Sequence, residues 1–169
     1  FSNLWNEFAT KANKIKIAVV DDHELFRTGL FTHLSIYQDL EIVINVENAN
    51  QLLNAIDNQE VDLILMDINL PDINGIEVTK VLKEKNANLK IIMLTGHELP
   101  SYVTNSMEAR ADGYLLKSSK ASEIYKAILT VINGGSYYNE QVKNIIASDV
   151  IRKHKLEYSG NNNLPAFSK

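Results

Sequence analysis

Residues 61–67 read VDLILMD, an apolar run that ends on the carboxylate of Asp67. A short stretch that is aliphatic almost throughout is typical of a strand in a parallel sheet, because helices cover both faces of such a sheet. The run therefore predicts a buried strand over Val61–Met66. Its carboxyl end would present Asp67 at the sheet edge where open α/β sheets bind their ligands.

Four similar runs are also predicted as strands, at Ile15–Val20, Glu41–Val46, Lys90–Leu94 and Gly113–Leu116. Apolar residues at helical spacing separate the runs, which gives five β/α units. Strands this short, joined by crossovers of a dozen or more residues, are expected to be parallel, and right-handed crossovers place helices on both faces. We therefore predict an α/β fold with a five-stranded, parallel, doubly wound sheet of the flavodoxin-like type, strand order 2-1-3-4-5.

The helical segments are marked by apolar residues and capping signals. The first segment is expected to bury Phe26, Leu30, His33 and Leu34, and the second Leu52, Leu53 and Ile56. The third is expected to bury Val78, Val81 and Leu82, and the fifth Ile124, Ala127, Ile128, Val131 and Ile132. Asn48 and Ser119 precede the second and fifth helices as N-cap candidates. The fourth helix, from about Pro100 to Arg110, has a sparse apolar stripe, which predicts a weakly anchored helix that is able to move.

The chain has 169 residues, which is long enough for one well-buried domain, and we place this domain at 15–135. Helical spacing after this domain predicts an additional C-terminal helix at 136–153. The polar end, 154–169, is interpreted as a linker. Residues 1–14 are interpreted as an N-terminal extension. Because the chain begins with Phe1 rather than Met, this extension is either a remnant of cloning or truncation, or a short docking helix.

Composition excludes several classes of protein. The net charge of −4 argues against direct nucleic-acid binding by this segment, because such modules carry a basic excess. The absence of cysteine excludes disulfides and thiolate metal sites and fits a cytoplasmic location. No apolar run approaches the roughly 20 residues that span a bilayer, so no membrane partner is expected. The histidines, His23, His33, His97 and His154, have no ligand spacing, which argues against a zinc site.

Polar residues end four of the five predicted strands. Asp21 and Asp22 follow the first strand, Asp67 the third, Thr95 the fourth and Lys117 the fifth. Because the carboxyl ends of parallel strands share one edge, we expect these groups to meet. Carboxylates within a few ångströms repel each other, and Mg²⁺ relieves this repulsion because it takes oxygen ligands. We therefore predict a magnesium site formed by the three aspartates.

This set of groups is suited to phosphoryl transfer. The backbone carbonyl of Asn69 would complete the metal site. Mg²⁺ would stabilise charge on a transferring phosphoryl group while Asp67 attacks phosphorus, and Lys117 would add a second positive charge. Thr95 would donate its hydroxyl to the product, an aspartyl phosphate. Each residue alone is more often an ordinary cap or turn residue, so the prediction depends on their coincidence at one edge.

Four segments, VVDDHELFRTGL, LILMDINLPDINGIE, IIMLTG and DGYLLK, follow one another between about Ile15 and Gly135. On these motifs the chain resembles the receiver domains of bacterial two-component response regulators, which have the CheY-like form of the flavodoxin-like fold. The pieces HELFRTGL, DGYLLKSS and INGGSYY are similar to the NarL/FixJ subgroup, and PAFSK resembles the lead-in to its LuxR-type helix-turn-helix module. The resemblance implies that this chain stops just before a DNA-binding domain.

The resemblance also implies roles for individual residues. These are the phosphoacceptor Asp67, the acidic pair Asp21 and Asp22 for Mg²⁺, the switch hydroxyl Thr95, the switch aromatic Tyr114 and the charge partner Lys117. The phosphoryl donor would be a histidine kinase, and phosphorylation would favour a homodimer that regulates transcription through the missing DNA-binding domain. Such a receiver is not an enzyme in the usual sense, although it can catalyse its own phosphorylation and dephosphorylation.

A conformational switch is expected from the positions of two of these residues. If Thr95 moves toward the phosphoryl oxygens, the space that it leaves would admit Tyr114. The surface formed by the fourth helix, the fifth strand and the fifth helix would then change shape. His97, two positions after Thr95, would overhang the site and affect the lifetime of the phosphoryl group.

Three other interpretations were weighed. A stand-alone receiver that acts by protein docking differs only in lacking the DNA-binding domain. A phosphohydrolase of the haloacid-dehalogenase type needs a second acid two residues after the nucleophile, and Asn69 stands there. A nucleotide-binding doubly wound domain would need G-x-G-x-x-G after the first strand, where this chain has Asp21 and Asp22 instead.

Overall fold

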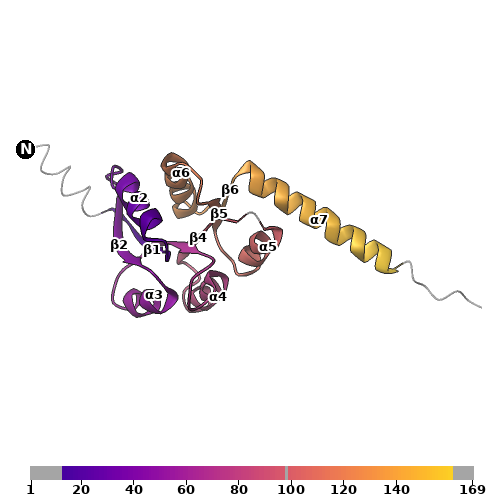
Figure 1. The fold of residues 1–169 in the computed structure, drawn as a ribbon, viewed down its shortest axis with the longest axis horizontal. Helices are drawn as coiled ribbons and strands as arrows, with labels where there is room; N and C mark the ends of the chain where they lie inside the picture. Colours follow the sequence, from indigo (N-terminus) through magenta and orange to yellow (C-terminus); the bar gives the residue numbers. More distant parts are fainter. Residues whose placement is uncertain (1–12, 98, 162–169) are drawn as a thin grey trace, which may run out of the picture.

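The fold is a single parallel sheet with helices on both faces, seen in a computed structural model that describes residues 13–97 and 99–161 (Figure 1). The strands are β1 Ile15–Val20, β2 Leu40–Val46, β3 Leu63–Asp67, β4 Lys90–Thr95, β5 Gly113–Leu116 and β6 Tyr137–Tyr138. The helices are α2 Glu24–Leu34, α3 Ala49–Ile56, α4 Gly75–Lys85, α5 Pro100–Glu108, α6 Ala121–Ile132 and α7 Glu140–Asn161. The strand order is β2-β1-β3-β4-β5-β6, which confirms the predicted topology and adds one strand.

Two hydrophobic cores hold the helices against the sheet. Helices α2 and α6 cover one face, where they pack on alternate strand residues such as Ile17 and Leu65. Helices α3, α4 and α5 cover the other face, where they pack on the intervening residues such as Ala18 and Met66. Because successive side chains of a strand point to opposite faces, each central strand is apolar along its whole length. This explains why the buried run of β3 was recognisable in the sequence.

The sixth strand was not predicted. Tyr137 and Tyr138 pair in parallel with Gly113 and Tyr114 of β5. A Cβ atom on Gly113 would lie 3.2 Å from the carbonyl oxygen of Tyr137, so the missing side chain allows the two strands to approach closely. Two residues are too few to show the alternation by which strands are recognised in a sequence. The consequence is that β5 is not an edge strand of the sheet.

Helix α7 corrects the predicted boundary between helix and linker. The helix predicted over 136–153 begins at Glu140 and continues to Asn161, so 154–161 is helical rather than part of a linker. This stretch is polar but contains good helix formers such as Lys155, Leu156 and Glu157, which is why composition alone misplaced the boundary. Residues 1–12 and 162–169 of the predicted extension and linker lie outside the described residues.

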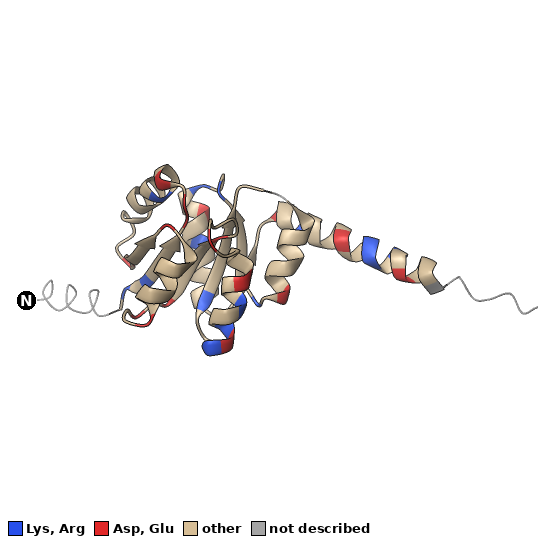
Figure 2. Ribbon diagram, turned by 60° about the horizontal axis from the view of Figure 1, so that its bottom comes forward, with Lys and Arg blue, Asp and Glu red and all other residues tan. Residues whose placement is uncertain are grey.

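The first half of α7 packs on the domain, and the second half projects from it (Figure 1). Val142 is fully buried, and α7 contacts α5. From Val150 onward every described side chain of α7 is exposed, and this part of the helix carries both basic and acidic residues (Figure 2). No helix among residues 13–97 and 99–161 combines the length and the apolar character needed to cross a bilayer.

Two expected core positions were wrong, and both errors have the same cause. His33 and Val81 are exposed, whereas their neighbours Leu34 and Leu82 are buried. Adjacent residues of a helix point about 100° apart, so a residue next to a core position lies at the edge of the buried stripe. Asn48 caps α3 as predicted, by accepting a hydrogen bond from the backbone N–H of Gln51. Ser119 does not cap α6.

Helix α4 also buries a charged residue, Lys83, next to the core residue Leu82. The Lys83 side chain is only 4% exposed, and its Nζ lies 2.6 Å from Asp112 Oδ2. Asp112 also accepts a hydrogen bond from the backbone N–H of Ile91. The pair therefore joins α4 to the start of β4 and to the turn that leads into β5.

We predict that Lys83→Ala lowers the free energy of unfolding by about 3 kcal/mol, because it leaves the Asp112 carboxylate partly buried without its counter-charge. Urea denaturation followed by circular dichroism measures this loss. Lys80→Ala on the same helix is the control. Lys80 pairs with Glu77 at the surface, so the control should change the unfolding free energy by no more than about 0.5 kcal/mol. Equal effects of the two substitutions would contradict the prediction.

Candidate functional site

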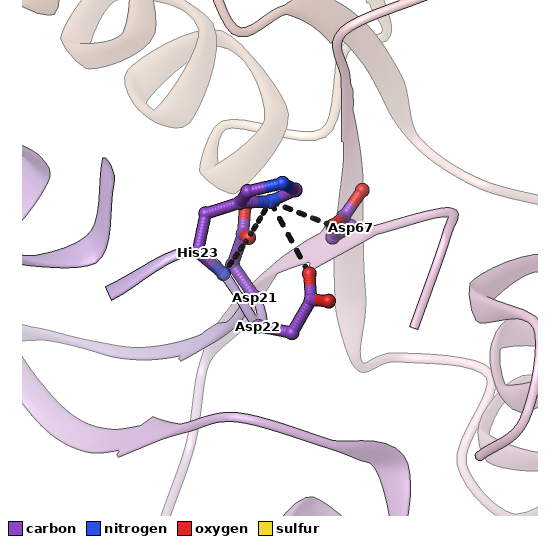
Figure 3. A group of neighbouring side chains, drawn as sticks. All are labelled: Asp21, Asp22, His23 and Asp67. Carbon is purple, nitrogen blue, oxygen red and sulfur yellow. Dashed lines mark hydrogen bonds and ion pairs between the residues drawn. The ribbon is translucent and has the colours of Figure 1, made fainter. Parts of the chain in front are cut away.

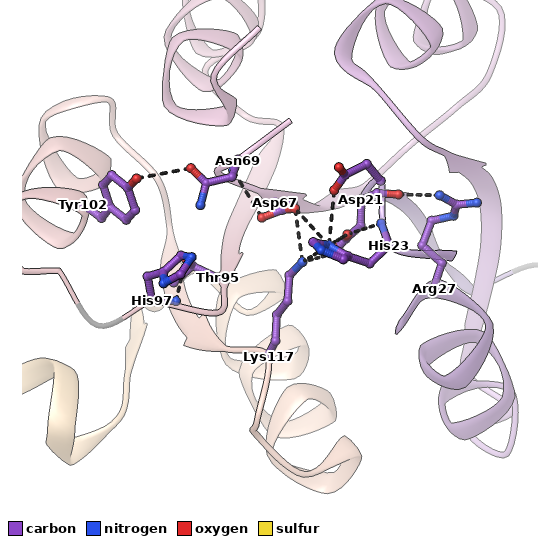
Figure 4. A network of polar contacts seen from close by, with 10 residues as sticks. Asp21, His23, Arg27, Asp67, Asn69, Thr95, His97, Tyr102 and Lys117 are labelled. Carbon is purple, nitrogen blue, oxygen red and sulfur yellow. Dashed lines mark hydrogen bonds and ion pairs between the residues drawn. The ribbon is translucent and has the colours of Figure 1, made fainter. Parts of the chain in front are cut away.

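The candidate site lies at the carboxyl ends of four strands, as predicted. Asp21 follows β1, Asp67 ends β3, Thr95 ends β4 and Lys117 follows β5. The side chains of Asp21, Asp67 and Thr95 are almost completely buried, and that of Lys117 is 15% exposed. Figure 4 shows that the Lys117 side chain extends from the loop after β5 toward the carboxylates of Asp21 and Asp67.

The Lys117 ammonium holds two carboxylates close together. Its Nζ lies 2.5 Å from Asp21 Oδ2 and 3.1 Å from Asp67 Oδ2. Burial raises the pKa of the Asp67 carboxyl, the negative charge of Asp21 raises it further, and Lys117 offsets part of this rise. One ammonium thus faces two buried acids. The edge of the sheet therefore carries an excess of negative charge that favours a further cation.

Asp22 and His23 extend the cluster toward solvent. The side chain of Asp22 is 38% exposed and that of His23 is 66% exposed. The backbone N–H of His23 donates a hydrogen bond to Asp21 Oδ1, which fixes the turn between β1 and α2. His23 was not predicted here, because the histidines were judged only by their spacing from one another. Its position next to two acids at a strand end was the available signal (Figure 3).

Arg27 on α2 also contacts the turn between β1 and α2. Its guanidinium donates a hydrogen bond to the backbone carbonyl of Asp21 and lies 3.7 Å from Glu47. A positive charge close to the first acid reduces the repulsion within the cluster. Arg27 was also missed from the sequence, because its role depends on a backbone carbonyl rather than on a motif.

A second set of contacts links the site to α5. The backbone N–H of Asn69 donates to Asp67 Oδ1 at 3.3 Å, and the Tyr102 hydroxyl of α5 donates to Asn69 Oδ1 at 3.2 Å (Figure 4). Tyr102 was not predicted as a site residue, since it comes from a different strand–helix unit. Helix α5 is therefore connected to the loop that follows Asp67. The role of the Asn69 carbonyl as a metal ligand stays a prediction.

The two expected switch residues lie in the interior. Thr95 Oγ1 accepts a hydrogen bond from the backbone N–H of His97, and the Tyr114 hydroxyl donates to the His97 carbonyl. Tyr114 is fully buried. The roles of Thr95 and Tyr114 as switch residues stay a prediction.

An open cleft of about 420 Å³ gives access to Asp67. Its lining residues are His23, Leu25, Phe26, Asp67, Asn69, Gly96, His97 and Lys117. His97 thus borders the site, as its place two residues after Thr95 suggested. The cleft is wide enough to admit a small phosphoryl donor or the side chain of a partner protein.

The turn after Asp67 depends on a glycine. A Cβ atom on Gly75 would lie 2.1 Å from the Asp67 carbonyl oxygen, which is far inside van der Waals contact. The Gly75 N–H donates to the carbonyl of Ile68, and the Asn74 side chain caps α4 by accepting from the N–H of Ile76. These contacts fold the loop back against the end of β3. The close approach explains why a glycine, Gly75, stands at this place in the sequence.

The cluster fits a divalent metal ion. Asp21 Oδ2 is buried and makes no hydrogen bond within the described residues, although it is paired with Lys117. The side chains of Asp21, Asp22, His23 and Asp67 each offer a donor atom, and these atoms lie within 4.8 Å of one another. A mainly carboxylate donor set of this size suits a hard cation such as Mg²⁺.

A parallel doubly wound sheet that places two buried acids, a lysine and a hydroxyl at one edge defines a phosphoryl-accepting signalling domain. Residues 17–129 match the response regulator receiver domain family. The chain belongs to this family.

Similar proteins agree with this assignment. The transcriptional regulatory protein DegU of Brevibacillus brevis is 37% identical over 130 residues, which are 77% of this chain and 55% of DegU. LnrK of Bacillus subtilis is 35% identical over 121 residues, which are 72% of this chain and 55% of LnrK. A LuxR-family two-component response regulator from Aurantimonas has a similar structure, with a TM-score of 0.77 and 25% identity, covering 82% of this chain and 99% of that chain. This chain thus spans about half the length of the two curated relatives.

We predict that Gly75→Ala lowers the free energy of unfolding by about 3 kcal/mol, because the new methyl group collides with the Asp67 backbone. The midpoint of urea denaturation measures the loss. Gly29→Ala is the matched control, since a Cβ atom there meets nothing within 4 Å. The control should raise the unfolding free energy by about 0.5–1 kcal/mol, because alanine favours a helix interior. A Gly75→Ala variant as stable as the wild type would refute the close approach.

Proposed function

We propose that Asp67 is the phosphoacceptor of this receiver domain and that a histidine kinase is its phosphoryl donor. The observation that carries the proposal is the position of the Asp67 carboxylate, which is buried at a strand end, paired with Lys117 and open to the cleft. A buried carboxylate in this setting is poorly solvated, so it is a better nucleophile than an exposed one.

The proposed reaction is a direct phosphoryl transfer. An Asp67 oxygen forms a bond to phosphorus while the bond between phosphorus and the histidine nitrogen of the kinase breaks, and the proton that neutralises the leaving imidazole comes from solvent. Asp21, Asp22, Asp67 and the carbonyl of Asn69 would hold Mg²⁺. When bound, Mg²⁺ neutralises charge on the phosphoryl oxygens. Lys117, already 3.1 Å from Asp67 Oδ2, supplies the second positive charge.

Phosphorylation would act on the rest of the domain through Thr95 and α5. The product adds up to about two negative charges and three strong acceptor oxygens beside Asp67. The Thr95 hydroxyl is a donor available to these oxygens, and its movement would break the contact with the His97 N–H. His97 also holds the Tyr114 hydroxyl. We therefore propose that Thr95 and Tyr114 switch together through His97.

The output of the switch would be dimerisation and, through a domain outside this sequence, control of transcription in the cytoplasm. The relatives DegU and LnrK are named as transcriptional regulators, which favours a DNA-binding output over a stand-alone receiver. The phosphohydrolase alternative lacks support, because Asn69 stands where a second acid is needed and its side chain is engaged by Tyr102.

We predict that the chain incubated with acetyl phosphate and Mg²⁺ gains one phosphoryl group, seen by intact mass spectrometry. Asp67→Asn should gain none. Asp57→Asn, which changes an exposed aspartate at the end of α3, should gain as much as the wild type. An adduct on the Asp67→Asn variant would refute Asp67 as the acceptor, provided that its circular dichroism spectrum matches that of the wild type.

The coupling of Thr95 to Tyr114 is tested by nuclear magnetic resonance. We predict that phosphorylation shifts the backbone amide signals of Thr95, His97 and Tyr114. Thr95→Val should still accept the phosphoryl group but lose most of the Tyr114 shift, because it lacks the hydroxyl. Thr104→Val is the control on α5, where the hydroxyl contacts only its own helix. A Tyr114 shift as large in Thr95→Val as in the wild type would contradict the coupling.

A further inference from the structure

His23 places a nitrogen atom in an otherwise carboxylate cluster. Its Nδ1 lies 3.0 Å from Asp21 Oδ1, 3.2 Å from Asp22 Oδ1 and 4.0 Å from Asp67 Oδ2. Figure 3 shows this nitrogen facing all three acids rather than solvent. The imidazole does not cap α2, for which it makes no side-chain hydrogen bond. The orientation of the ring is instead explained by the contact of Nδ1 with Asp21 Oδ1.

The three distances from His23 Nδ1 are compatible with one coordination shell. An octahedral ion with bonds of about 2.1 Å keeps neighbouring donor atoms about 3.0 Å apart and opposite donors about 4.2 Å apart. The distances from Nδ1 to Asp21 and Asp22 are close to the first value, and the distance to Asp67 is close to the second. The nitrogen thus fits a position next to two carboxylates and opposite the third.

The Lys117 ammonium gives an independent indication that these groups converge. Its Nζ lies 3.1 Å from His23 Nδ1, in addition to its contacts with Asp21 and Asp67. The imidazole nitrogen and the two buried acids therefore surround the same positive charge. Asp21 Oδ2 is buried, and Lys117 is its partner.

We propose that His23 is a ligand of the divalent metal at this site and that it shifts the metal preference from Mg²⁺ toward Mn²⁺. The proposal rests on the proposed function in one respect, since it assumes that the aspartates bind the metal. Mg²⁺ strongly favours oxygen ligands, whereas Mn²⁺ also suits carboxylate oxygen but, as a first-row transition ion, accepts an imidazole nitrogen more readily than Mg²⁺ does. A site with three carboxylates and one imidazole has a mixed donor set in which Mn²⁺ gains from the nitrogen and Mg²⁺ does not.

The test measures metal binding by the unphosphorylated chain. Electron paramagnetic resonance of free Mn²⁺ gives the Mn²⁺ affinity, and competition gives the Mg²⁺ affinity. We expect His23→Ala and His23→Phe to lower the Mn²⁺ affinity about tenfold and to leave the Mg²⁺ affinity within about twofold of the wild type. Pulsed spectra of bound Mn²⁺ should show hyperfine coupling to a nitrogen in the wild type and lose it in both variants. His33→Ala, an exposed histidine on α2, should change nothing.

Two further variants separate this proposal from the proposed metal site itself. Asp22→Asn and Asp67→Asn should both weaken Mn²⁺ and Mg²⁺ binding. If neither does, the carboxylate site is wrong. If both do, the carboxylate site stands and the His23 variants decide the present inference. His23 is not a ligand if its variants bind Mn²⁺ like the wild type. It is also not a ligand if they bind both metals equally weakly but keep the nitrogen coupling.

Discussion

The repulsion between the buried carboxylates of Asp21 and Asp67 is the constraint on which the site depends. Burial and mutual repulsion raise the pKa of Asp67, and one ammonium, that of Lys117, is shared between the two acids. Charges removed from water cost stability unless they are paired, so the two hydrophobic cores on either side of the sheet must offset this arrangement. In return, the sheet edge keeps an excess of negative charge, which favours a cation.

Most of the fold could be predicted because its central strands are apolar on both faces. The run before Asp67 is an example, since every residue of β3 is buried. What could not be predicted depends on contacts between distant segments. The two residues of β6 form a strand only because Gly113 leaves room beside them. Lys83 would be assigned to the surface from its charge, yet it is buried because Asp112, far along the chain, neutralises it.

The candidate site shows the same division. The residues placed directly at strand ends, such as Asp67 and Lys117, were recognised because parallel strands share an edge. Tyr102 was missed because its hydroxyl reaches the site from the first turn of α5, a different strand–helix unit. His23 was next to the predicted acids, but only coordinates could show which way its ring points. The residues at strand ends can thus be predicted from the sequence, but the direction in which a side chain on a neighbouring helix or loop extends cannot.

Helix α7 packs on α5 and extends far beyond it, so a movement of α5 would displace the far end of α7. Its 22 residues correspond to a rod of about 33 Å at 1.5 Å per residue. The rod is anchored on α5 near Val142, and α5 in turn is tied to Asn69 through Tyr102. A tilt of α5 by about 10° would swing the far end of a rod this long by about 6 Å. A helix of this length therefore converts a small displacement of α5 into a larger displacement at its far end.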